Sequence, residues 1–306
     1  MRKALNLLWT ILSAPFRFAA WLIRSIFRWI ANIFHEIAGF FDEEVEDTPL
    51  PDAFAKTVEN PQEILFHLNA LRKHLLRAVL VLGIATAFAF VFNRQILALL
   101  SLPLEGGMES LVAIEVTEPI GTVMRVSLLT GFAIAFPYLA LETWLFIGPG
   151  VSKRSRIFGL MAIPIAFLFF LSGMAFAYFV MLPASLPFLL NFGGITTIPR
   201  PSSYVKFVTG IMFWIGIAFE FPLVIFIFAK VGLIQAQTLI KQWRLAIVII
   251  AILAALITPT IDPVNMALVM GPMILLYFLS IGLALLAQRG REKKSALEDV
   301  PEGNLL

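Results

Sequence analysis

The chain has 306 residues, of which 59% are hydrophobic and 14% charged, with a mean hydropathy of +0.90 and a formal net charge of +3. This composition excludes an ordinary soluble domain and predicts a polytopic membrane protein. The chain has no cysteine, which excludes disulfides, thiol catalysis and cysteine metal sites, and it contains no HExxH, Walker or GxSxG motif.

Residues 1–41 form an aromatic leader with basic residues at helical spacing. Arg17, Arg24 and Arg28 share a polar stripe, and Trp9 and Trp21 stand among the apolar residues between. This pattern predicts an amphipathic helix lying in the membrane interface. One alternative is a further membrane span, although the arginines interrupt its apolar run. A cleaved signal peptide is a weaker alternative, because no small-residue cleavage site follows the apolar residues. Residues 42–60 are acidic and contain Pro49 and Pro51, which predicts a flexible linker.

The chain then begins a membrane domain, predicted at residues 61–289. An amphipathic helix over 61–77 is expected to run directly into a first span over 78–92. Residues 93–117 contain Pro103 and the turn pair Gly106-Gly107, which predicts an ordered loop. Five further spans are predicted at 119–147, 157–182, 206–230, 243–257 and 265–287. The loops between them are predicted at 148–156, 183–204, 232–242 and 258–263. The tail from 288, assigned to a separate cytoplasmic segment at 290–306, is polar and expected to be disordered.

The fourth predicted span carries one carboxylate, Glu220. A helix from Lys206 to Lys230 is about 36 Å long at 1.5 Å per residue, which is enough to cross a hydrocarbon layer of about 30 Å. A charged acidic side chain deep in the bilayer costs about 2.5–3.5 kcal/mol, so Glu220 is a candidate functional residue. The alternative is a protonated Glu220 hydrogen-bonded inside the bundle. Pro222 is expected to bend the helix beside it.

Basic residues near the span ends predict the orientation. They gather on one side, at Arg72, Lys73, Arg77, Lys153, Arg154, Arg156, Lys230, Lys241, Arg244, Arg289, Arg291, Lys293 and Lys294. The other side carries Glu105, Glu109, Glu115, Glu118 and Asp262. The positive-inside rule places the first side in the cytoplasm, and six spans place both termini there.

Six strings in the membrane domain resemble one known family. They are HLNALRKHLL at 67–76, TEPIGTVMRVSL at 117–128, WLFIGPGVSKRSR at 144–156, GMAFAYFVMLP at 173–183, FWIGIAFEFPLVI at 213–225 and ITPTIDPVNM at 257–266. In this order they resemble TatC, the polytopic receptor subunit of the twin-arginine protein translocase.

The resemblance implies an all-α fold of six transmembrane helices in a concave bundle. It implies a non-enzymatic subunit of the cell membrane that binds signal peptides with paired arginines. It also implies partnership with single-span TatA- and TatB-type subunits, in an oligomeric complex that exports folded proteins with the proton-motive force. No cofactor, metal or nucleic acid is implied. The implied signal-peptide or partner-binding residues are Leu71, Arg72, Pro103, Glu142, Phe146, Pro149, Glu220 and Asp262.

Two departures from the family pattern bear on recognition. The family usually has a glutamate where this chain has Ala70, and another where spacing places Ser155. A carboxylate pairs bidentately with arginine, whereas alanine cannot and serine offers only a neutral hydroxyl. Met266 also replaces a common glutamine. Glu142 is a candidate to supply the missing carboxylate near the cytoplasmic mouth, and its alternative is a buried partner of a neighbouring polar group.

Three functions remain open from the sequence. The first two are a working receptor and a diverged paralogue with altered or lost arginine-pair recognition that acts as a membrane scaffold. A proton-coupled transporter that uses Glu220 and Glu142 is the third alternative, although no inverted repeat is apparent.

Overall fold

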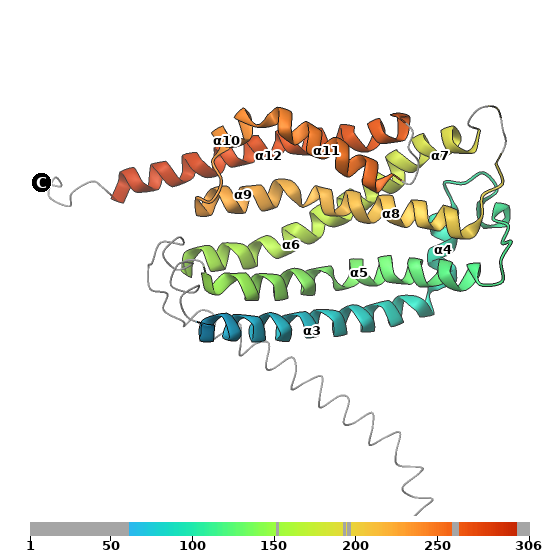
Figure 1. The fold of residues 1–306 in the computed structure, drawn as a ribbon, viewed down its shortest axis with the longest axis horizontal. Helices are drawn as coiled ribbons and strands as arrows, with labels where there is room; N and C mark the ends of the chain where they lie inside the picture. The colour runs from blue at the N-terminus through green and yellow to red at the C-terminus, as the bar shows by residue number, and fades with distance from the viewer. Residues whose placement is uncertain (1–60, 151–152, 192–193, 195–196, 259–262, 299–306) are drawn as a thin grey trace, which may run out of the picture.

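Figure 1 shows a bundle of long helices in a computed structural model that describes residues 61–150, 153–191, 194, 197–258 and 263–298. Across these residues the chain consists of helices joined by turns and short extended segments. The predicted all-α class is therefore confirmed. The leader at 1–41, the linker at 42–60 and Asp262 lie outside the described residues, so the expectation of an interfacial helix stays a prediction.

The first part of the bundle contains two long helices and a short one between them. Helix α3 (Pro61–Val91) joins the predicted amphipathic helix and the first span without a break. The expectation of a continuous loop after it was wrong, because α4 (Asn93–Ser101) and the 3-10 turn η1 (Gly107–Ser110) form there. The predicted turn is present, with Gly106 at φ +85° and Gly107 at φ +59°, a conformation that glycine adopts without strain. Helix α5 (Glu118–Ile147) follows.

The third predicted span is longer than expected. After the short turn η2 (Gly148–Gly150), helix α6 (Lys153–Phe176) continues through a π-helical turn, η3 (Ala177–Met181), into α7 (Leu182–Leu190). The prediction ended this helix at Leu182, because the segment from Pro183 to Tyr204 is rich in proline and glycine. The helix continues because the wider turn precedes the proline, which then lies in the first turn of α7, where prolines are tolerated.

The fourth predicted span is two helices that meet at Glu220. Helix α8 (Pro201–Phe219) ends there and α9 (Phe221–Val231) begins, with Pro222 in its first turn. The helix is thus interrupted beside Pro222, where a bend was expected, and Glu220 lies at the junction of the two helices.

The last helices are α10 (Ala236–Lys241), α11 (Trp243–Ile257) and α12 (Pro263–Glu298). Helix α12 extends through residues predicted as a disordered tail, so that expectation was wrong up to Glu298. Five apolar segments among the described residues are long enough to span a membrane, and α11 is a shorter apolar helix. At 15 residues α11 is about 22 Å long, which agrees with the expected short span.

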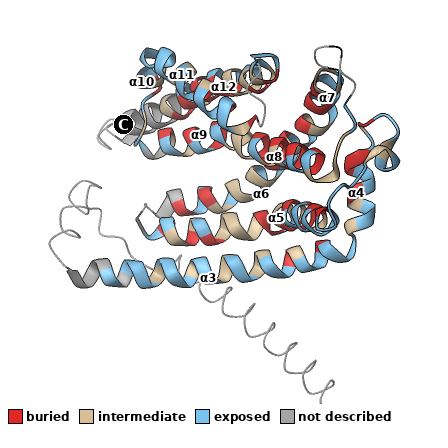
Figure 2. Ribbon diagram, turned by 45° about the vertical axis from the view of Figure 1, so that its right-hand side comes forward, coloured by how far each residue is buried: buried red, intermediate tan, exposed pale blue. Residues whose placement is uncertain are grey.

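Helix α8 forms the centre of the packing. Figure 2 shows its buried residues, whereas the outer face of α3 is largely exposed. The buried side chains of α8 include Val205, Val208 and Ile215. Helices α6 and α8 come unusually close, because a Cβ atom on Gly173 would lie only 2.8 Å from the Cα of Gly216. Small residues at crossings let helix backbones pack tightly inside a membrane, and the apolar side chains on the outside then face lipid.

Candidate functional site: two ends and a groove

One end of the bundle gathers basic residues, and we call it the basic end. It comprises residues 61–77 of α3, the first turn of α6, the last turns of α5 and α9, and η2, which lie together on the left of Figure 1. Arg72, Lys73, Arg77, Arg156 and Lys230 belong to these segments. The sequence-derived grouping of these basic residues is therefore consistent with the arrangement of the helices.

Glu142 lies near the basic end and is only 2% exposed. Its Oε2 is 2.5 Å from Nδ1 of His74, its Oε1 accepts a hydrogen bond from the hydroxyl of Tyr138, and Nη1 of Arg77 lies 4.0 Å from Oε1. Both carboxylate oxygens thus have partners on α3 and α5. Glu142 ties these two helices together, and in this arrangement it does not point into open solvent.

Phe146, one of the predicted binding residues, lies beside this cluster. The ring of Phe146 lies 4.6 Å from that of His67 and 6.1 Å from that of His74, measured between centroids. Leu71 and Arg72 on α3 are exposed, as is Pro149 in η2. The basic end therefore carries an aromatic ring, an exposed apolar side chain and an exposed guanidinium group. We call this set, Leu71, Arg72, Phe146 and Pro149, the mouth of the basic end.

Arg156 does not contribute an exposed charge to this mouth. It is 1% exposed, and its Nε and Nη2 donate to the carbonyl oxygens of Gly148 and Pro149 at 3.0 and 3.2 Å. Its own carbonyl accepts a hydrogen bond of 3.0 Å from Nε1 of Trp144. The guanidinium satisfies carbonyls at the end of α5, so the loop presents less positive charge than its sequence indicated.

Glu220 lies on the wall of an apolar groove between α8, α9, α11 and α12. The groove has a volume of about 580 Å³, and its lining includes Trp214, Ala218, Leu253 and Tyr277. Oε1 of Glu220 is buried and accepts no hydrogen bond within the described part of the chain. The alternative of a protonated Glu220 hydrogen-bonded inside the bundle therefore has no partner at this oxygen among the described residues.

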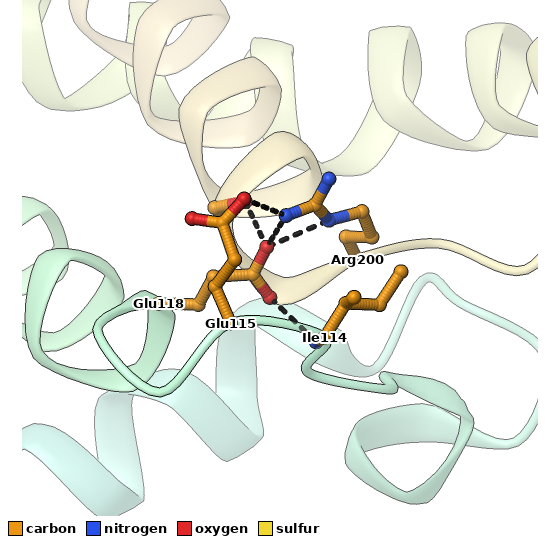
Figure 3. Close-up of polar contacts among 5 residues, drawn as sticks. Ile114, Glu115, Glu118 and Arg200 are labelled. Carbon is orange, nitrogen blue, oxygen red and sulfur yellow. Dashed lines mark hydrogen bonds and ion pairs between the residues drawn. The ribbon is translucent and has the colours of Figure 1, made fainter.

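The opposite end of the bundle is held by an ion-pair network that the sequence did not predict. Figure 3 shows Arg200, before α8, beside Glu115 and Glu118, which flank the start of α5. Nε of Arg200 donates to Glu118 at 2.6 Å, and Nη2 donates to Glu115 at 3.0 Å and to Glu118. The backbone N–H of Ile114 donates to the other oxygen of Glu118 at 3.2 Å. These contacts raise the pKa of Arg200 above its ordinary value, through hydrogen bonds to Glu115 and then to Glu118.

The predicted binding residues thus fall into three places. Leu71, Arg72, Glu142, Phe146 and Pro149 meet at the basic end, Glu220 lies in the groove, and half-buried Pro103 follows α4 at the opposite end. No arrangement of three or more potential metal-binding side chains occurs among the described residues. Glu142's partners were missed because His74 is 68 positions away in the chain. Three histidines in an otherwise apolar protein were the available signal.

Comparisons with known proteins give one consistent family. The model of "Sec-independent protein translocase protein (TatC)" matches residues 66–272. The chain is 32% identical over 228 residues to a Sec-independent protein translocase protein TatC of Carboxydothermus hydrogenoformans, covering 74% of this chain and 94% of that protein. The TatC protein of Deinococcus radiodurans is 33% identical over 226 residues, covering 71% of this chain and 84% of that protein.

Solved structures agree with the sequence comparisons. A crystal structure of the twin arginine translocase receptor TatC matches with a TM-score of 0.65 at 33% identity, covering 73% of this chain and 100% of that chain. A second crystal structure of that receptor, in DDM, matches with a TM-score of 0.64 at 32% identity and covers 71% of this chain. The match therefore extends over the whole of the solved receptor chain.

Proposed function

The chain belongs to the TatC family of Sec-independent protein translocase proteins, and from this membership we propose how it works as a twin-arginine translocase subunit. It is a multi-pass membrane protein of a transport family. It lies in the cell membrane with the basic end and both termini in the cytoplasm. There it binds signal peptides of folded proteins, whose export the proton-motive force drives, and it catalyses no chemical reaction itself.

The match over the whole of the solved receptor chain supports this proposal most strongly. The alternative of an unrelated proton-coupled transporter does not survive the family match. At the basic end, the mouth formed by Leu71, Phe146 and Pro149 offers apolar contact for the peptide. The engaged state of Glu142, together with alanine at position 70, favours weak dependence on paired arginines, as in the diverged-paralogue alternative.

Peptide binding tests the receptor function. A twin-arginine signal peptide carrying a photoreactive group is expected to crosslink to the basic end, and Phe146→Ala is expected to reduce that crosslinking. A peptide with both arginines changed to lysine measures how strongly the pair is recognised. A peptide that crosslinks equally to the opposite end, or with no dependence on Phe146, contradicts binding at this mouth.

The groove beside Glu220 is the proposed contact for a single-span subunit of the TatA or TatB type. Its lining is apolar, which suits a membrane helix, and Glu220 is the acidic residue among the residues that line it.

Co-purification from native membranes tests this contact. Ala218→Trp fills the groove and is expected to release the single-span subunit, and Glu220→Leu is expected to weaken its binding. The matched control is Ala87→Trp, which adds the same bulk at an exposed position of α3. Retention of the subunit by both groove variants, or its equal loss in the control, would contradict the proposed contact.

A further inference from the structure

A second groove lies at the basic end, between α6 and α9. It has a volume of about 240 Å³ and is bounded by apolar residues of both helices, including Phe158, Met161, Ala162 and Phe226. Met161 and Ile165 on its rim are 65% and 46% exposed, so the groove opens on the outer surface of the bundle. In a membrane protein this surface meets the acyl chains of lipid.

The inner side of this groove is closed by a close approach between helices. Gly159 lines the groove, and a Cβ atom placed there would lie 1.9 Å from the indole ring of Trp144. The indole therefore occupies the space behind the glycine. The groove is a shallow trough along the lipid-facing surface and does not lead into the bundle.

Lys230 supplies a positive charge at one end of the trough. Its Nζ lies 3.3 Å from the centroid of the Phe158 ring and 5.7 Å from that of Phe226. The faces of aromatic rings attract cations, and these two rings fix the ammonium group at the end of the groove. Lys230 is in the last turn of α9, and Phe158 is near the start of α6, so this charge lies at the level where the spans end.

An apolar trough that ends at a fixed cation matches the shape and charge of a phospholipid. We propose that the groove between α6 and α9 binds one anionic phospholipid, with an acyl chain along Ala162 and Ile165 and its phosphate at Lys230. Basic pockets between transmembrane helices at the cytoplasmic side are a general means of holding anionic headgroups.

Native mass spectrometry of the full-length protein in detergent tests this site. After delipidation, the protein is titrated with phosphatidylglycerol, with phosphatidylcholine, or with inorganic phosphate. We expect one phosphatidylglycerol to bind about tenfold more tightly than phosphatidylcholine, which equals about 1.4 kcal/mol. Inorganic phosphate alone is expected neither to bind at the site nor to displace the lipid.

Two pairs of variants separate the site from general charge and bulk. Lys230→Gln is expected to abolish the preference for phosphatidylglycerol, whereas Lys241→Gln, which removes an exposed lysine on α10, is expected to keep it. Ala162→Phe fills the trough and should reduce lipid binding, whereas Ala87→Phe on α3 should not. Equal loss in Lys241→Gln, an unchanged preference in Lys230→Gln, or saturation by inorganic phosphate would overturn the proposal. So would occupation of the trough in native membranes by a protein segment that crosslinks to position 162. Circular dichroism of each variant confirms that it is folded.

Discussion

At the scale of single residues, the two positions where the family usually has glutamate are the ones expected to affect recognition of the arginine pair. Ala70 is half-buried on α3, next to the exposed Leu71 and Arg72. Ser155 lies in the first turn of α6 at the same end of the bundle. Both positions are thus near the mouth that Phe146 lines. Glu142, the candidate replacement, is committed to His74 and Tyr138.

Restoring both carboxylates is therefore expected to strengthen binding of a twin-arginine peptide. A charge-assisted hydrogen bond contributes about 1.5–3 kcal/mol, so Ala70→Glu with Ser155→Glu should improve affinity by about tenfold or more. The measurement is peptide crosslinking or binding to the double variant and to wild type. The matched control is Ala70→Gln with Ser155→Gln, which is isosteric and uncharged. Tight wild-type binding that disappears with a lysine-pair peptide, and does not change in the double variant, would show that arginines are recognised elsewhere.

Removing the carboxylate of Glu142 is expected to loosen α3 from α5. Glu142→Gln keeps the shape but cannot accept from all three partners, which should cost about 1–3 kcal/mol of stability. Glu142→Leu removes the carboxylate that His74, Tyr138 and Arg77 share, and breaking a buried pair costs about 3–5 kcal/mol. Thermal unfolding in detergent measures both. Glu109→Gln, at an exposed position of η1, is the control and should change stability by less than about 0.5 kcal/mol. Equal melting temperatures for Glu142→Leu and wild type would refute this role.

At the scale of elements, the helices differ in how far local sequence determines them. The bounds of α11 agree with the predicted span over 243–257. The apolar run of α11 is short and is bounded by polar residues at both ends, so the sequence alone could predict where this helix begins and ends. The continuation of α6 through a π turn into α7 was not readable, because it depends on how the chain accommodates Pro183. Helix α4 was missed because its nine residues directly precede Pro103 and the Gly106-Gly107 turn, and the whole segment was assigned to one loop.

The crossing of α6 and α8 is expected to tolerate no side chain at Gly173. A methyl group there would lie 2.8 Å from both the Cα of Gly216 and the carbonyl oxygen of Ile215, which are backbone atoms that cannot move aside. Overpacking of this kind costs about 1–3 kcal/mol, so Gly173→Ala should lower the melting temperature. Gly210→Ala on α8 is the control, because nothing lies within 4 Å of its added methyl group and alanine favours helix. A Gly173→Ala protein as stable as the Gly210→Ala protein would show that the two helices separate easily.

At the scale of the whole molecule, the distribution of charge and the arrangement of helices agree. Basic residues that are far apart in the chain meet at one end of the bundle, and the carboxylates of residues 105–118 meet at the other. Hydropathy and charge bias could predict this arrangement because both are properties of whole spans. The Glu142 cluster, the Arg200 network and the two grooves could not be predicted, because each joins residues from helices whose relative rotation is set only by packing.

The orientation of the molecule is tested by labelling single cysteines in a chain that has none of its own. The positive-inside rule places the basic end in the cytoplasm. Exposed Gln235, between α9 and α10, should then face the cytoplasm, and exposed Glu109 and Ser203 should face outward. Ser203 is preferable to Ser202, because the hydroxyl of Ser202 lies 3.2 Å from Glu118 in the Arg200 network and its loss would disturb that end. With a membrane-impermeant maleimide on cells whose outer face is accessible, Glu109→Cys and Ser203→Cys should react at once. Gln235→Cys should react only after the membrane is opened. Labelling of position 235 in sealed cells would reverse the orientation and place the peptide-binding mouth on the wrong side for a receptor.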